Sequence, residues 1–403
     1  MKKYRILSVH NYYQISGGED TVVANEKKMM ESCGHTVISY VRRNEEIRSS
    51  GILRRVWLGM NSFFSLKTYL EVKDIIKKEE IDIVHVHNTV PLISPSVFYA
   101  ALWSHVPVVQ TIHNFRPLCP NGILYRDGAV CEECLDKGLL CAVRHRCYRG
   151  SVLQTALLAG NIWFYRKIGL YKKINLIALT EFNKEKLLSI NKKRTYIDPD
   201  RVFVKPNFTA DGGPIVPFPD RKKQMVYAGR LEEAKGVKLL FKTWRKFEKL
   251  EKGWELIVCG TGSLQEWCLD YIEKKNIRTI RMLGSVEHGR LMDIIGCSRA
   301  LLMPTCWYEG FGLVVAESFS RGTPVIGSSF GNVGDMIKDG INGWGFKKDS
   351  EQDFLDKLCR AEARELTETA YNDYKEKYSV QINYDILMDI YGSITRKLRY
   401  GER

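Results

Sequence analysis

The sequence lacks any long uninterrupted run of apolar residues. A membrane-spanning helix needs about 18 or more such residues, and the nearest candidate, residues 152–164, is broken by polar side chains and a glycine. The sequence opens on MKKYRILSVHN, which has neither the longer apolar block nor the small-residue cleavage site of a secretory signal. We therefore expect a chain that is neither exported nor membrane-spanning, so that any membrane contact is peripheral.

Two further absences narrow the class of protein. No Gly-x-Gly-x-x-Gly motif follows the first apolar run, which disfavours a dinucleotide-dependent oxidoreductase. No nucleic-acid-binding module is recognisable, and the basic residues are dispersed along the chain, so we expect no nucleic-acid partner. The net charge of +14 instead favours other anionic partners, such as nucleotides or acidic lipid surfaces.

The length and the pattern of the chain indicate two domains. At 403 residues the chain is too long for one ordinary domain. Strand-like and helix-like blocks alternate from residue 4 to 205 and again from residue 225 to 326, a pattern typical of parallel strands joined by crossover helices. Between them, TADGGPIVPFPDRKK at residues 209–223 has three prolines and two glycines, which favours a linker.

We therefore predict an α/β fold in which two doubly wound, Rossmann-like domains face each other across a cleft. The first domain is expected at residues 1–208, with a cysteine-rich insert at 116–150, and the second at 224–380. Residues 381–403 should form a helix that packs back on the first domain. In open sheets of this kind, ligands bind beyond the carboxyl ends of the strands.

The motif YAGRLEEAKGV at residues 227–237 places two cations at a turn between a strand and a helix. The strand ends at Gly229, Arg230 follows it directly, and Lys235 precedes the helix. Two cations beside a glycine that permits close approach, with helix amides nearby, are suited to binding a diphosphate. The alternative is a solvated basic turn.

A second motif, PTCWYEGFGLVVAE at residues 304–317, pairs two glutamates. Glu309 lies in a glycine-rich turn, and Glu317 follows eight residues later, just over two helical turns on, so both can point into one pocket. Gly310 and Gly312 allow backbone amides to approach a ligand, and a helix that starts near Leu313 directs its positive end there.

These two motifs together resemble the retaining glycosyltransferases of family 4, also called glycosyl transferases group 1, which have the GT-B fold. The resemblance covers nearly the whole chain. Further matching segments follow in the family's order, namely Gly17-Gly18, HVHN at 85–88, TIHN at 111–114 and Pro206-Asn207.

The resemblance implies a site for a nucleotide-sugar donor. Arg230 and Lys235 would bind the diphosphate, Glu317 the ribose hydroxyls and Glu309 the donor sugar, while His113 would reach the sugar at the reacting centre. The catalytic residues would thus be His113, Glu309, Arg230 and Lys235. The other residues that it places around the donor are Gly17, Gly18, Gly229, Gly260, Gly262, Val286, Gly310, Phe311, Gly312 and Leu313.

The resemblance also implies a reaction. A hexosyl group would move from a UDP- or GDP-sugar to a glycan or lipid-linked glycan acceptor of cell-surface polysaccharide synthesis, with retention of configuration by same-face substitution. Two cations at the departing diphosphate stabilise the transition state more than the ground state, so no metal or other cofactor is required for catalysis. The alternatives are a nucleotide-sugar epimerase of related two-domain form and a basic nucleotide-binding protein without transferase activity.

Histidines mark the ends of several expected strands. His85 and His87 alternate along an apolar run, so we expect one to face the core and the other the strand end. His113 follows a strand at a cleft position, where a functional role is expected. His10 and Asn11 end the first strand, where either could line the cleft or cap the next loop.

The insert holds five of the eleven cysteines. Cys131 and Cys134 have the two-residue spacing that lets both thiolates bind one tetrahedral ion, and we predict a structural zinc site. Its expected ligands are Cys119, Cys131, Cys134 and Cys147. Either Cys141 or His145 could replace one of them, and the alternative is an insert with unbound thiols or a reversible disulfide.

Residues 51–78 have the pattern of a basic amphipathic helix, which can lie on an acidic membrane. The residues concerned are Arg54, Arg55, Trp57, Leu58, Met60, Phe63, Phe64, Leu66 and Lys67. A helix packed on the first sheet with a basic edge is the alternative. We therefore expect a cytoplasmic protein, located at the inner face of the cytoplasmic membrane if this contact forms.

Overall fold

The computed structural model describes residues 2–12, 17–44, 59, 61–192, 194–363 and 365–399. Contacts divide the chain into two compact units. Unit 1 comprises Met1–Gly122, Glu133–Asn207 and Asn383–Arg403, and unit 2 comprises Ile123–Glu132 and Phe208–Ile382. Among the described residues, no helix combines the length and the apolar character that crossing a membrane requires.

Unit 1 is built on a parallel sheet of six strands in the order β2-β1-β3-β4-β7-β8. The strands are β1 (Arg5–Tyr12), β2 (Thr36–Arg43), β3 (Ile83–Asn88), β4 (Val108–Ile112), β7 (Asn175–Ala178) and β8 (Val202–Val204). Because the order reverses between β1 and β3, their carboxyl ends flank a crevice of the kind where ligands bind.

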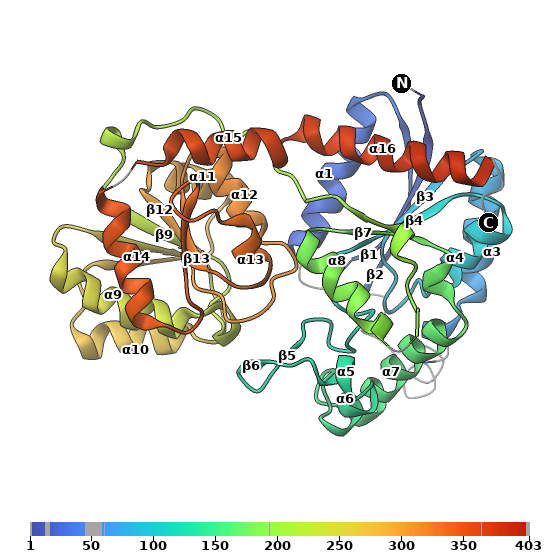
Figure 1. Ribbon diagram of the computed structural model, residues 1–403, viewed down its shortest axis with the longest axis horizontal. Coiled ribbons are helices and arrows are strands. Elements are labelled where there is room, and N and C mark those ends of the chain that lie inside the picture. The colour runs from blue at the N-terminus through green and yellow to red at the C-terminus, as the bar shows by residue number, and fades with distance from the viewer. Residues whose placement is uncertain are drawn as a thin grey trace. The chain divides into compact units, whose positions relative to one another are not determined.

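Helices cover this sheet (Figure 1). They are α1 (Gly18–Ser32), α3 (Leu66–Lys78), α4 (Ser96–Trp103), α7 (Val152–Lys167), α8 (Glu181–Leu188) and α16 (Val380–Arg399). Glu26 of α1 and Tyr391 of α16 both contact His85 of β3, so these two helices cover the same face of the sheet. Tyr384 of α16 also bonds His35, at 3.0 Å, which ties the end of the chain to its beginning.

The cysteine-rich insert follows β4. It contains a hairpin of β5 (Tyr125–Arg126) and β6 (Ala129–Val130), and the short helices α5 (Glu133–Asp136) and α6 (Leu140–Arg144). Contacts assign Ile123–Glu132 to unit 2 and the rest of the insert to unit 1. Within unit 2, the Tyr308 hydroxyl donates to the Glu132 carboxylate at 2.8 Å.

Unit 2 contains a second parallel sheet of six strands, in the order β11-β10-β9-β12-β13-β14. They are β9 (Gln224–Ala228), β10 (Glu255–Cys259), β11 (Ile280–Gly284), β12 (Ala300–Met303), β13 (Val325–Ser328) and β14 (Gly343–Phe346). Here the strand order reverses between β9 and β12. In sheets of this kind, ligands bind at the carboxyl ends of the two strands that flank the reversal.

The helices of unit 2 are α9 (Val237–Leu250), α10 (Gln265–Lys275), α11 (His288–Cys297), α12 (Leu313–Ser320), α13 (Gly331–Met336), α14 (Glu351–Ala363) and α15 (Thr367–Lys377). Short 3-10 turns occur in the two units at Leu170–Lys172, Ser189–Lys192, Pro199–Arg201, Phe218–Asp220 and Glu233–Lys235. Helices α9 and α14 lie side by side against the sheet (Figure 1). Trp244, Phe247 and Phe354 are fully buried there, because these helices place apolar side chains at helical spacing on one face.

The division differs from the expected domains in two places. Part of the insert, Ile123–Glu132, groups with unit 2 rather than unit 1. The expected linker, residues 209–223, also belongs to unit 2, because the buried Arg221 guanidinium donates to the carbonyls of Ser298 and Arg321 at 2.9 Å. Proline and glycine exclude regular structure in this segment, but they do not prevent its side chains from being anchored.

Candidate functional site

The loops after β9 and β10 meet at glycines. The amide of Gly229 donates to the carbonyl of Cys259 at 3.0 Å, and Gly260 has a φ of +137°. A Cβ on Gly260 would lie 1.9 Å from the Gly229 oxygen, and one on Gly262 would lie 2.5 Å from the oxygen of Leu231. Side chains are therefore excluded at both positions, and the two loops line one edge of the sheet with backbone.

The loop after β9 approaches the end of β12 in the same way. Gly236 has a φ of +70°, and a Cβ there would lie 1.7 Å from the carbonyl oxygen of Pro304. This close approach brings Lys235 to the turn that carries Glu309. Residues 74 apart in the sequence thus meet where the strand order reverses.

Lys235 and Glu309 form the central ion pair of unit 2. The Lys235 ammonium lies 2.7 and 2.9 Å from the two carboxylate oxygens, and the Trp307 indole and the Thr305 hydroxyl donate to the first of these at 2.7 and 3.1 Å. Burial raises the pKa of Glu309, but Lys235 and these donors outweigh it and hold the pKa below its ordinary value. The carboxylate is therefore ionised and fixed in orientation.

Arg230 lies on the exposed side of this turn. Its guanidinium pairs with Glu232 at 2.7 Å, and 61% of its side chain is exposed. Since exposed ion pairs are weak, the guanidinium can turn toward an anionic ligand at little cost. Lys235 and Arg230 therefore differ: one is fixed by a buried carboxylate, and the other is available at the surface.

Glu317 of α12 is bonded to His288, the first residue of α11, at 3.0 Å. The bond to Glu317 raises the pKa of His288 above its ordinary value. Glu287 caps the same helix by accepting from the amides of Gly289 and Arg290 at 3.0 and 3.3 Å. Val286 directly precedes this cap, in the loop after β11.

Backbone at the start of α12 completes this edge of unit 2. Gly312 is the N-cap, with a φ of +97°, and Leu313 is the first helical residue. The Asn332 amide donates to the Gly310 carbonyl at 2.9 Å, and Phe311 is buried. The positive end of α12 is thereby held beside Glu309.

The face of the unit 1 sheet that meets α1 and α16 carries a buried cluster of histidines. His85 and His87 stack with ring centroids 4.4 Å apart, and both are buried. Both point to the same face because residues two apart in a strand do so. His85 bonds Tyr391 and Thr111 in the core, and His87 lines a cavity at the end of β3, which agrees with the expectation of one at the core and one at the strand end. His87 Nδ1 lies 3.1 Å from His113 Nε2, so β3 and β4 are joined by a bond between their histidines.

Glu26 of α1 and Lys205 supply the charges of this cluster. Glu26 Oε1 lies 3.0 Å from His85 Nδ1 and 3.7 Å from His87 Nε2, and Glu26 Oε2 lies 3.0 Å from Lys205 Nζ. Burial raises the pKa of Glu26, but Lys205 and His85 hold it well below its ordinary value. The carboxylate is therefore ionised, with the fully buried Lys205 as its counter-charge.

His113 and His87 are neutral in this environment. Burial lowers the pKa of His113 to about 3, and burial followed by the charge of His85 lowers that of His87 well below its ordinary value. The three groups Glu26, His85 and His87 also have a spacing that could hold a metal ion. However, the ammonium of Lys205 already neutralises the carboxylate, so the charge that would attract a cation is compensated.

The first turn of α1 lies at the end of β1. His10 bonds Asp20 at 2.7 Å, and the amide of Gly17 donates to the same carboxylate at 3.2 Å. A Cβ added to Gly17 or Gly18 would meet no atom of the described residues within 4 Å, so both glycines leave open space at the helix start. Asn11 accepts from the amide of Leu92 at 3.3 Å, so it holds a neighbouring loop.

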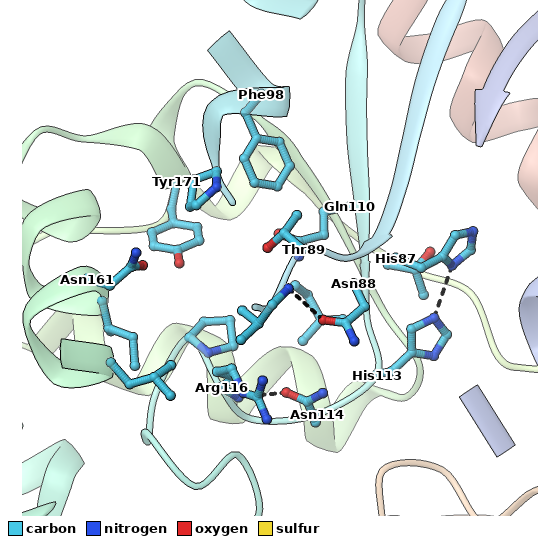
Figure 2. A pocket seen from close by; sticks show the side chains of 17 residues that line it. His87, Asn88, Thr89, Phe98, Gln110, His113, Asn114, Arg116, Asn161 and Tyr171 are labelled. Carbon is cyan, nitrogen blue, oxygen red and sulfur yellow. Dashed lines mark hydrogen bonds between the residues drawn. The ribbon is translucent and has the colours of Figure 1, made fainter. Parts of the chain in front are cut away.

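A cavity of about 60 Å³ opens at the carboxyl ends of β3 and β4 (Figure 2). His87 and His113 lie at one end of it in this view, and Asn161 and Tyr171 at the other. Arg116 and Asn114 border it between these ends.

Two cysteines of the insert, Cys119 and Cys134, lie near the guanidinium of Arg166. Among the described residues, the group with a spacing that could hold a metal ion is Glu26, His85 and His87, and no three of the predicted ligands Cys119, Cys131, Cys134 and Cys147 have that spacing. Cys119 and Cys134 are buried, and Cys131, Cys141 and Cys147 are half-buried. Burial lowers the pKa of Arg166, while the nearby thiols of Cys134 and Cys119 raise it.

Two family models match this chain side by side. Glycosyltransferase Family 4 matches residues 16–208, and Glycosyl transferases group 1 matches residues 214–378. The chain belongs to the GT-B glycosyltransferases. The two parallel sheets and the reversal of strand order in each agree with that fold.

Relatives of this glycosyltransferase vary in how much of the chain they match. The glycogen synthase of Mycobacterium tuberculosis is 31% identical over 121 residues, which is 30% of this chain and 29% of that protein. An uncharacterized glycosyltransferase of Methanocaldococcus jannaschii is 21% identical over 94% of this chain and 95% of its own length. The lipopolysaccharide 1,2-N-acetylglucosaminetransferase of Salmonella typhimurium is 24% identical over 38% of this chain and 44% of its own. This chain thus spans less than a third of the first of these relatives.

Solved structures share the fold at low sequence identity. A glycosyltransferase from Rickettsia africae has a TM-score of 0.69 at 17% identity, with 98% of this chain and 99% of that chain covered. An Anabaena protein in complex with UDP has a TM-score of 0.65 at 13% identity, with 96% and 99% covered.

In this glycosyltransferase, the residues expected around a donor fall in both units. Unit 2 brings together Gly229, Lys235, Gly260 and Glu309, with Arg230 at the surface of the same turn. Glu317 is held by His288 rather than by another residue that the sequence singled out. Gly17, Gly18 and His113 belong to unit 1.

Several residues that shape these sites were missed from the sequence. They are Glu26, Arg116, Lys205, His288, Trp307 and Asn332. Glu26 lies in a helix and Lys205 in a loop after a short strand, far apart in the chain, so no local pattern connects them. His288 did carry a signal, because it follows Glu287 at the start of an expected helix.

We expect the free energy of unfolding to fall as the pH drops below about 6.5. His87 and His113 have folded pKa values depressed below that of the unfolded chain, so the unfolded chain binds protons that the folded chain does not. The contribution of these two histidines to the free energy of unfolding is therefore complete above a pH of about 6.5. Below that pH, the free energy of unfolding falls by up to about 1.4 kcal/mol per pH unit for each of them. Urea unfolding from about pH 7.5 to about pH 5 measures this slope.

The variant His113→Asn should have a shallower slope than the unmodified protein. His105→Asn, a change at an exposed loop position, is the matched control and should leave the slope unchanged. Equal slopes in all three proteins would contradict a neutral His113.

Proposed function

We propose that this protein transfers a hexosyl group from a nucleotide-diphosphate sugar to a glycan or lipid-linked glycan, with retention of anomeric configuration. The observation that carries the proposal is the Lys235–Glu309 pair at the point where the strand order of unit 2 reverses. A fixed cation and a fixed carboxylate, beside backbone amides at the start of α12, suit a sugar linked to a diphosphate.

The diphosphate is the part of the donor that Lys235 and Arg230 would bind. As the bond to the sugar breaks, the leaving diphosphate gains negative charge, and cations at that position stabilise the transition state more than the ground state. The Anabaena neighbour, solved with UDP, supports a uridine nucleotide, and a GDP-sugar is the other donor that we propose. Glu309, held by Lys235 and Trp307, would accept from a sugar hydroxyl.

Glu317 would bind the ribose hydroxyls. In doing so it would exchange its bond from His288 for bonds from two hydroxyls, and the mostly exposed His288 side chain can move aside. His113, neutral near pH 7, would contact the donor sugar without adding a charge to compete with the leaving group. The acceptor hydroxyl would attack the anomeric carbon from the same face as the one from which the leaving group departs. Its proton would pass to the leaving phosphate.

Replacing either cation should lower turnover. Because Lys235→Ala also leaves the buried Glu309 carboxylate unpaired, its melting temperature is measured beside its turnover. We expect Lys235→Ala and Arg230→Ala each to lower kcat/KM by about 100-fold or more, because each removes a charge from the departing diphosphate. Lys238→Ala is the matched control, since Lys238 lies about one turn further along the chain and pairs with the exposed Glu233. Steady-state turnover of UDP- and GDP-sugars measures the effect.

Product analysis separates this proposal from its alternatives. A product that joins sugar and acceptor supports transfer, whereas an epimerised sugar still attached to its nucleotide supports an epimerase. Unchanged turnover in both Lys235→Ala and Arg230→Ala would overturn the assigned mechanism. Nucleotide binding without any turnover would support a binding protein.

We propose that the acceptor is presented at an acidic membrane surface. Several of the residues expected to contact it, including Trp57 and Arg54, lie outside the described residues. The described part carries an aromatic surface on unit 1, formed by Phe64, Leu66, Leu70, Trp103 and Phe164. Of these, Leu66, Leu70 and Trp103 are 60%, 55% and 59% exposed.

Ring contacts make this aromatic surface continuous. Trp103 contacts Tyr69 and Tyr99 at 5.4 and 5.3 Å between centroids, and Tyr99 in turn contacts Phe64 at 6.1 Å and Tyr165 at 6.3 Å. Lysines of α3 border the surface, among them the exposed Lys67. Apolar and aromatic side chains with a basic rim are typical of proteins that bind anionic lipid.

Flotation with vesicles tests the aromatic surface. The double variant Leu66→Ser, Leu70→Ser should reduce recovery with phosphatidylglycerol vesicles by about tenfold or more, because two exposed leucines no longer enter the lipid. Leu250→Ser, Leu269→Ser is the matched control, since both leucines are similarly exposed but lie in unit 2. Equal recovery of all proteins, or none with acidic vesicles, would contradict the proposal.

We also propose that Cys119, Cys131, Cys134 and Cys147 hold a structural zinc ion. The buried Arg166 near Cys119 and Cys134 supports it, because a zinc ion with four thiolates carries a net negative charge that a guanidinium offsets. Zinc would hold the insert together and would take no part in the transfer.

Metal analysis of the purified protein should find about one zinc per chain. Cys131→Ser and Cys134→Ser should lose the metal and lower the melting temperature, since a structural zinc contributes to folding. Cys297→Ser, outside the insert and likewise half-buried, is the control. Substoichiometric zinc in the unmodified protein would favour unbound thiols or a disulfide.

A further inference from the structure

The cavity at the carboxyl ends of β3 and β4 is lined by one arginine, Arg116. Among the described residues that line it, none is an aspartate or a glutamate, and Arg116 alone carries a permanent charge. The cavity of about 60 Å³ has room for a few water molecules or for one small oxyanion.

The backbone of Arg116 is hydrogen-bonded, but one nitrogen of its guanidinium has no partner among the described residues. Its backbone amide donates to Asn114 Oδ1 at 3.0 Å, and its guanidinium lies 5.8 Å from the centre of the Tyr148 ring. Its Nε is buried and has no hydrogen-bond partner in the part of the chain that the structure describes. A buried donor without an acceptor costs free energy. An oxyanion in the cavity would meet the other nitrogens of the guanidinium, and hydrogen bonds from a cation to an anion are strong.

The neutral lining groups suit an anion as well. Burial raises the pKa of Tyr171, so its hydroxyl keeps its proton and can donate. The amide side chains of Gln110 and Asn114 also line the cavity, and Asn114 lies beside Arg116 (Figure 2). Neutral donors around one guanidinium resemble the sites that bind phosphate or carboxylate in other proteins.

We propose that this cavity binds an anionic group of the acceptor, a phosphate or a carboxylate, through Arg116. The inference rests on the proposed transferase function. His113 lines the same cavity, so an acceptor anchored at Arg116 has its neighbouring part beside His113. Arg116 is thus a specificity-determining residue that selects acidic acceptors, and it takes no part in binding the donor.

Binding of simple anions tests this site without a known acceptor. Inorganic phosphate is titrated into the unmodified protein in the presence of saturating UDP, or of GDP if only that nucleotide binds, so that the cations of unit 2 are occupied. Arg116→Gln should weaken phosphate binding by about tenfold to 100-fold, as expected for loss of a charged hydrogen-bond partner. Arg116→Lys keeps the charge and should weaken it less.

Arg149→Gln is the matched control. Arg149 lies over the same Tyr148 ring, at 5.3 Å, but does not line the cavity, so phosphate binding should be unchanged. Nucleotide binding, followed by the rise in melting temperature, should be equal in all the variants and shows that each is folded. Phosphate binding that is the same in Arg116→Gln and in the unmodified protein would overturn the proposal.

The source of the anionic group is distinguished by two further probes. Glucuronate presents a sugar carboxylate, and a detergent-dispersed isoprenyl phosphate presents a lipid phosphate. The probe whose affinity falls most in Arg116→Gln identifies the class of acceptor. If neither probe nor phosphate binds in an Arg116-dependent manner while nucleotide binds normally, this site is wrong and the transferase proposal stands. Failure of every nucleotide to bind would instead count against the proposed function.

Discussion

A buried carboxylate needs a permanent positive partner, and each unit of this protein is organised around one such pair. Glu309 is held by Lys235 in unit 2, and Glu26 is held by Lys205 in unit 1. Removing one member of a buried pair leaves an uncompensated charge that costs about 3–5 kcal/mol. The pairs therefore constrain the loops that carry them. In unit 2 the constraint fixes the glycine-rich turn before α12, and in unit 1 it fixes the stacked histidines behind His113.

The two pairs differ in what they leave accessible. Lys235 keeps 16% of its side chain exposed, and Arg230 beside it is largely exposed, so an anion can reach both. Lys205 is completely buried and pairs with Glu26 inside unit 1. One pair therefore leaves charge accessible at the surface, while the other lies wholly inside unit 1, where burial keeps the neighbouring His87 and His113 neutral. This contrast is the reason that we assign the diphosphate to unit 2. In unit 1, the described lining of the cavity offers neutral donors and the guanidinium of Arg116.

Close backbone approaches connect the ion pair of unit 2 to its sheet. Gly236 touches Pro304, and Gly260 touches Gly229, at separations that no side chain could tolerate. The glycines therefore do more than make turns flexible, because they set how near the loops after β9, β10 and β12 can lie. Without the close approach of Gly236 to Pro304, the loops that carry Lys235 and Glu309 would lie further apart. The close approach of these loops brings the two side chains to the 2.7 Å at which they pair.

The sequence alone determined the alternation of strands and helices, the two parallel sheets and the motifs around Arg230 and Glu309. These features are local, since periodicity and glycine spacing act over a few residues. It treated the anchored segment around Arg221 as a linker. Only the tertiary structure paired Glu26 with Lys205 and Glu317 with His288, and placed Arg116 in a cavity whose described lining has no acidic residue. Such pairs join segments far apart in the chain, and burial, which gives a charge its energetic weight, exists only once the sheets have packed.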